Sequence, residues 1–91
     1  MGKVIVTMKI MPSDPELDLS KIEEQLREVV SAEGGMMKSV ERVPIGFGIV
    51  SLVINYSIDE NKGTDDMENL FVTKVEGVES AQTTMTSRAL G

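Results

Sequence analysis

The chain has 91 residues, no cysteine, no histidine and a net charge of −6. Its length allows one domain, and the missing side chains exclude a disulfide framework, a zinc–thiolate site and the most common general base. The acidic balance argues against a nucleic acid or an anionic membrane as partner, because both bind clustered Lys and Arg, and it favours a basic protein surface.

Residues 4–10 alternate apolar and polar side chains, which predicts a half-buried β-strand. Turn-forming residues 13–16 follow and lead into a helix that the glycines at 34–35 end. On the outer face of this helix we expect Glu23 and Arg27 to pair one turn apart. The apolar side chains at helical spacing are Leu19, Ile22, Leu26, Val29 and Val30.

Residues 36–44 predict a second strand, whose charged side chains suit the edge of a sheet. Residues 49–58 form the strongest strand pattern, and Thr64 is expected to cap a second helix that ends at Gly77. Residues 78–86 predict a last strand. One face of the strand at 49–58 is Val50, Leu52, Ile54, Tyr56 and Ile58. The apolar stripe of the second helix is Met67, Leu70, Phe71 and Val75.

The predicted order is therefore βαββαβ. Right-handed crossovers place both helices on one face of a four-stranded antiparallel sheet. This is the ferredoxin-like α+β sandwich, and we expect residues 1–91 to form it as a single domain. No apolar run approaches the roughly 18–20 residues of a membrane span, so we expect a cytoplasmic protein.

The segment Pro44–Ile45–Gly46–Phe47–Gly48 lies between two predicted strands and should form the tip of a hairpin. Glycines there supply positive φ angles. The residues alone leave two interpretations of Phe47 open. Its ring either folds back onto the sheet or stays exposed as an aromatic anchor for a partner.

Arg88 is the only basic residue after Lys74, and we expect it to follow the last strand. It is either an ordinary solvated charge or a cationic group that reaches into a partner. The acids Asp59, Glu60, Asp65 and Asp66 lack the spacing of a twelve-residue calcium loop. A charged turn and helix start are therefore favoured, and no metal site is expected.

No catalytic set is present in the sequence. None of the Ser residues lies in a Gly-x-Ser-x-Gly elbow, and no Walker-type phosphate loop occurs. We therefore expect no catalytic residues and no cofactor, and a binding protein is favoured over an enzyme.

Three segments together resemble the elongation factor 1-beta family in its short archaeal form. They are residues 4–12, residues 44–48 and residues 75–80, and the length and order of elements match from end to end. The resemblance implies guanine-nucleotide exchange on elongation factor 1-alpha with its bound nucleotide. In eukaryotic relatives the phenylalanine of the second segment, here Phe47, contacts the GTPase, and a lysine near the C-terminus, at the place similar to Arg88, reaches toward the magnesium site.

On this resemblance the predicted partner-binding residues are Pro44, Ile45, Gly46, Phe47, Gly48 and Arg88. Two other classes stay open: a ferredoxin-like RNA-binding or small-ligand regulatory domain, and an enzyme that uses two carboxylates. RNA recognition needs stacking aromatics and a basic face, and of the sheet residues Tyr56 is the only aromatic candidate.

Overall fold

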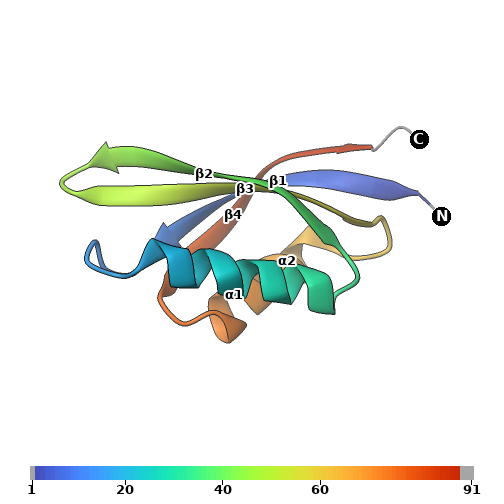
Figure 1. Cartoon of the computed structure of the whole chain (residues 1–91). Coiled ribbons are helices and arrows are strands. Elements are labelled where there is room, and N and C mark those ends of the chain that lie inside the picture. Colours follow the sequence, from blue (N-terminus) through green and yellow to red (C-terminus); the bar gives the residue numbers. More distant parts are fainter. Residues whose placement is uncertain (1, 89–91) are drawn as a thin grey trace.

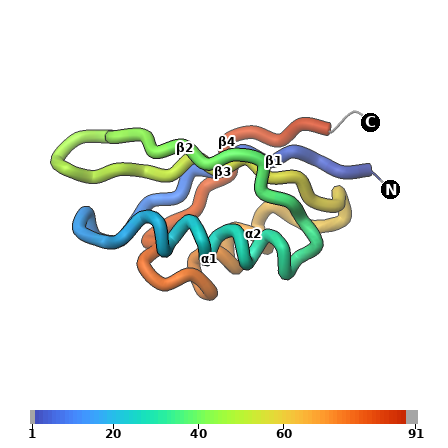
Figure 2. The backbone as a smooth tube through the Cα atoms, viewed as in Figure 1, coloured from blue at the N-terminus to red at the C-terminus, as the bar shows by residue number. Residues whose placement is uncertain are grey.

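The computed structural model describes residues 2–88, and its elements follow the predicted βαββαβ order (Figure 1). The elements are β1 (Lys3–Pro12), α1 (Leu19–Ala32), β2 (Met36–Gly46), β3 (Ile49–Asp59), α2 (Thr64–Lys74) and β4 (Val78–Arg88). The strands form one antiparallel sheet in the order β2-β3-β1-β4. Both helices cover the same face of it, which confirms the ferredoxin-like fold (Figures 1 and 2).

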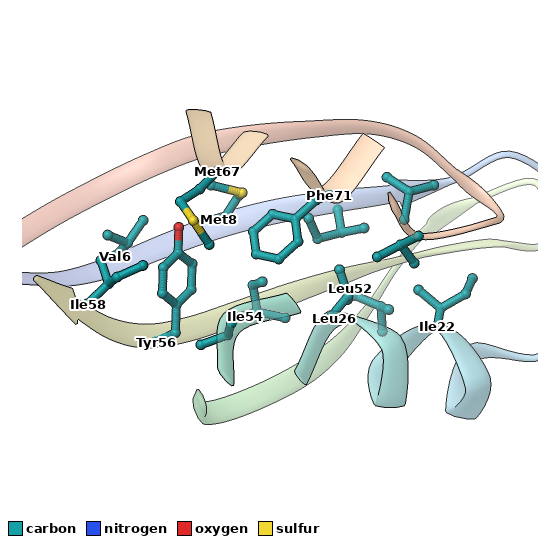
Figure 3. Packing of buried hydrophobic residues seen from close by; sticks show 14 residues of the cluster. Val6, Met8, Ile22, Leu26, Leu52, Ile54, Tyr56, Ile58, Met67 and Phe71 are labelled. Atoms are coloured by element: carbon teal, nitrogen blue, oxygen red, sulfur yellow. The ribbon is translucent and has the colours of Figure 1, made fainter. Parts of the chain in front are cut away.

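The hydrophobic core lies between the sheet and the two helices (Figure 3). Alternate residues of the two central strands face the helices, as the sequence pattern predicted. Tyr56 and Phe71 meet there edge to face, with ring centroids 5.9 Å apart. Each large apolar side chain that is fully buried stabilises the fold by roughly 1.5–3 kcal/mol. The fully buried members include Val6, Met8, Ile10, Leu26, Leu52, Ile54, Tyr56, Ile58, Met67 and Phe71.

β2 is an edge strand, as its charged side chains predicted. Two local predictions, by contrast, are wrong. Thr64 is the first residue of α2, not its cap; Gly63 holds the cap position and makes no side-chain bond there. Glu23 is not paired with Arg27, because its carboxylate instead accepts a hydrogen bond from Arg42 of β2 at 2.8 Å. A pair between neighbouring elements replaces a pair within the helix.

The Tyr56 hydroxyl is a polar group inside this core (Figure 3). It is buried and has no hydrogen-bond partner among the described residues. Burial, together with the nearby carboxylate of Glu68, raises the pKa of Tyr56 above its ordinary value. An unpaired buried hydroxyl destabilises a fold, since it has lost its bonds to water.

Replacing Tyr56 by Phe keeps the ring against Phe71 and removes the hydroxyl. We expect the Tyr56→Phe variant to gain about 1 kcal/mol in its free energy of unfolding and about 4–8 °C in Tm, measured by thermal and urea unfolding. Tyr56→Leu is the control, and it should be less stable because it also removes the ring contact. A lower Tm for Tyr56→Phe would show that the hydroxyl is bonded in solution.

The wild type and Tyr56→Phe should also differ in how their stability depends on pH. Above about pH 10 the unfolded tyrosine loses its proton while the folded one keeps it. The unfolded state then binds fewer protons, so the stability of the wild type falls as the pH rises through this range. Tyr56→Phe lacks this proton, and its stability advantage should therefore grow above about pH 10. An advantage that stays constant from about pH 8 to 11 would mean that the pKa is not raised in the folded state.

Candidate functional site

The turn between β2 and β3 has an unusual backbone. Gly46 and Ile49 form the last pair of the hairpin, so Phe47 and Gly48 are its two central residues. Their φ angles are 57° and 76°, and both are positive, as in type I′ turns. Such turns favour Asn-Gly. For Phe47 the left-handed conformation costs roughly 1–2 kcal/mol.

The ring of Phe47 is fully exposed, with a relative accessibility of 101%. The structure therefore contradicts the interpretation in which it folds back onto the sheet, and it leaves the anchor interpretation standing. A strained backbone that holds a large apolar side chain in solvent is the kind of outlier from which a function can be inferred.

Residues 43–50 form the end of the hairpin, which we call the hairpin arm. It extends past the start of α1 in Figure 1. Besides Phe47, the arm exposes Val43 at 38% and Ile45 at 42%, and Pro44 is also exposed. The arm therefore exposes several apolar side chains close together along the chain, which is typical of a protein-binding surface. Val43 is one of these exposed residues that the sequence analysis missed.

Arg88 lies inside β4, opposite Val4, and not beyond the last strand as predicted. The strand is longer than its sequence pattern because Ser87 and Arg88 pair with Ile5 and Val4 of β1. The guanidinium Nη1 lies 3.9 Å from Oε2 of Glu60, and 82% of the side chain is exposed. This is a loose surface pair, which contributes little to stability.

The structure does not bring all the predicted partner-binding residues together. Phe47 precedes the first residue of β3, whereas Arg88 lies at the end of the sheet where Asp59 finishes that strand. With 11 residues in β3, the two sites are about 35 Å apart at roughly 3.3 Å per residue. They occupy opposite ends of a molecule that measures 42 × 22 × 19 Å.

Within residues 2–88, no group of three or more acidic residues is placed to hold a metal ion. Neither helix of the described chain has the length and apolar character that a membrane crossing needs. Tyr56, the aromatic candidate for RNA stacking, points into the core. The exposed face of the sheet therefore has no platform for stacking bases.

Comparison with known proteins agrees with the geometry. A model of the EF-1 guanine nucleotide exchange domain matches residues 5–88. Elongation factor 1-beta of Natronomonas pharaonis is 41% identical over 81 residues, which cover 88% of this chain and 90% of the relative. Elongation factor 1-beta of Pyrococcus abyssi is 39% identical over 87 residues, or 93% of each chain. The protein of that name from Methanobrevibacter smithii is 32% identical and covers 99% of this chain and 100% of the relative.

The matched region includes β1 from Ile5 onward, the hairpin arm and β4 to its last residue. It therefore contains both the exposed apolar tip and the exposed cation at the other end of the sheet. The chain belongs to the EF-1 guanine nucleotide exchange domain family, and it is a guanine-nucleotide exchange factor of translation elongation.

Proposed function

We propose that this protein promotes the exchange of GDP for GTP on elongation factor 1-alpha in the cytoplasm, and that residues 1–91 act as one exchange domain. The observation that carries the proposal is the fully exposed ring of Phe47, held in a strained conformation at the tip of the hairpin arm. The contacts with the GTPase are assigned to Pro44, Ile45, Gly46, Phe47, Gly48 and Arg88. Neither nucleic acid nor a membrane is part of the proposed complex.

Phe47 acts as the anchor. Burying an exposed phenylalanine in a pocket of the partner contributes roughly 1.5–3 kcal/mol. The strained turn already holds the ring away from the sheet, so little conformational freedom is lost when it binds. Aromatic side chains of this kind often dominate the energy of an interface.

Arg88 acts on the nucleotide site. A GTPase holds GDP with backbone amides around the phosphates and with a bridging Mg²⁺ ion. A guanidinium placed near that ion repels it and competes for its ligands. The loose pair with Glu60 leaves Arg88 free to make such contacts at little cost.

Because Phe47 and Arg88 are about 35 Å apart, the two side chains cannot touch one nucleotide. In the proposed complex the ring anchors one part of the GTPase while Arg88 works at another. The exchange factor and GDP then weaken each other's binding reciprocally. Each ~1.4 kcal/mol removed from the release barrier speeds GDP release about tenfold.

No covalent bond is made or broken in this mechanism. The factor lowers the barrier for a ligand to leave, so it needs neither a nucleophile nor a general base. We therefore propose that this protein is not an enzyme in the usual sense and uses no cofactor.

The anchor role predicts the effect of changing Phe47. Phe47→Asn removes the ring and creates the Asn-Gly pair that such turns favour, so the fold should be kept. We expect the factor concentration for half-maximal stimulation of fluorescent-GDP release to rise roughly 10- to 100-fold. Phe47→Ala should act in the same direction.

The control is Val72→Ala, because Val72 is an exposed apolar residue on α2, 41% accessible and away from the arm. It should leave the half-maximal concentration unchanged. Unaltered stimulation by Phe47→Asn would refute the anchor role and, with it, the proposed docking surface.

The role of Arg88 predicts a different kinetic effect. We expect Arg88→Ala to lower the maximal rate of stimulated GDP release by about tenfold and to change the half-maximal concentration much less. Lys74→Ala removes one exposed positive charge elsewhere, and it should change neither quantity. If Arg88→Ala weakens docking alone, Arg88 is an interface charge and does not act on the nucleotide site.

A further inference from the structure

The hairpin arm begins where β3 loses both its pairing with β1 and its cover by the helix layer. Ile10 and Leu52 form the last pair between β1 and β3, so toward the tip the hairpin is a ribbon of β2 and β3 alone. The helix layer ends at the same level, because Leu52 is fully buried whereas Val50, the next residue on that face, is half-buried.

An isolated two-stranded ribbon is marginally stable and twists more variably than a broader sheet. The arm continues for several residues without a third strand or a helix against it. Its direction relative to the rest of the molecule therefore depends on contacts at the junction where it leaves the sheet.

Arg42 lies at this junction, directly opposite Leu52. Its Nε donates a hydrogen bond to Oε2 of Glu23 at 2.8 Å, and its Nη2 donates one to Oγ of Ser20 at 3.2 Å. Ser20 and Glu23 are three residues apart near the start of α1, so they share one face of the helix. The planar guanidinium thus bridges the edge strand to two side chains of α1.

We infer that Arg42 is a positioning residue for exchange, because it braces the hairpin arm against α1 and so holds Phe47 in the orientation that docks. This inference rests on the proposed function. Arg42 lies five residues from the tip and its donors are turned toward the helix. It acts through the direction of the arm and not by touching the partner.

The brace should affect docking far more than overall stability. Half of the Arg42 side chain is exposed, and ion pairs of this kind contribute little to the folded state. When the brace is lost, the arm samples several directions and only a fraction of molecules present the ring correctly. The apparent dissociation constant then rises in inverse proportion to that fraction.

The test compares Arg42→Gln, Glu23→Gln and the double variant in titrations of stimulated GDP release. We expect each single variant to raise the half-maximal factor concentration about two- to fivefold without changing the maximal rate. Both single variants remove the contact between Arg42 and Glu23. The double variant should therefore raise the half-maximal concentration no more than the more affected single variant does. Additive losses would overturn the brace, since the two side chains would then act separately.

The matched control is Lys62→Gln. Lys62 donates to Oε1 of Glu33 at the same distance of 2.8 Å, but this pair joins the β3–α2 loop to the end of α1, away from the arm. It should leave the half-maximal concentration unchanged. An equal loss in Lys62→Gln would show a general effect of surface ion pairs and would overturn the inference.

Amide hydrogen exchange of the free protein gives a readout that needs no partner. In Arg42→Gln and Glu23→Gln we expect the amides of residues 43 and 45–50 to exchange faster, while those of β1 keep their protection. Unchanged exchange in the arm would overturn the brace. If the arm loosens and Phe47→Asn still leaves GDP release unaltered, the proposed function fails instead, so the two failures are distinguishable.

Discussion

β3 extends beyond the two elements that support it, namely β1 and the helix layer. This difference in length produces the hairpin arm. Its pairing with β1 ends at Ile10 and Leu52, and the helices stop covering it at the same level. The remainder of the strand continues with β2 as a two-stranded arm. A hairpin that ended with the core would leave Phe47 beside the helices, where the ring could pack against its own chain instead of a partner.

The two ends of the sheet have opposite character. One presents apolar side chains on a strained turn, and the other presents Arg88 in a loose pair with Glu60. Neither arrangement stabilises the fold, and both keep a side chain available for contacts outside the molecule. The packed core holds the sheet between them, whereas the direction of the hairpin arm depends on the contacts that Arg42 makes with α1.

The fold was predictable because its central elements follow simple rules of spacing. Alternation identified β1 and β3, helical spacing identified α1 and α2, and glycines marked the turns that follow the helices. Tyr56 and Phe71 lie in the core as predicted, because they belong to these patterns. Phe47 was recognisable as a hairpin residue for the same reason, whereas the exposure of its ring was one of two interpretations that the residues alone left open.

The sequence by itself therefore determined the order of elements, the faces that form the core and the apolar tip, since each depends on residues that are close along the chain. Only the tertiary structure decided that Arg88 lies in β4 at the end opposite the tip, and that Glu23 pairs with Arg42 instead of Arg27. Strand register and the placement of a helix over a sheet bring together residues that are far apart along the chain. No local spacing records such contacts, because they form only when the packed core fixes the positions of the separate elements.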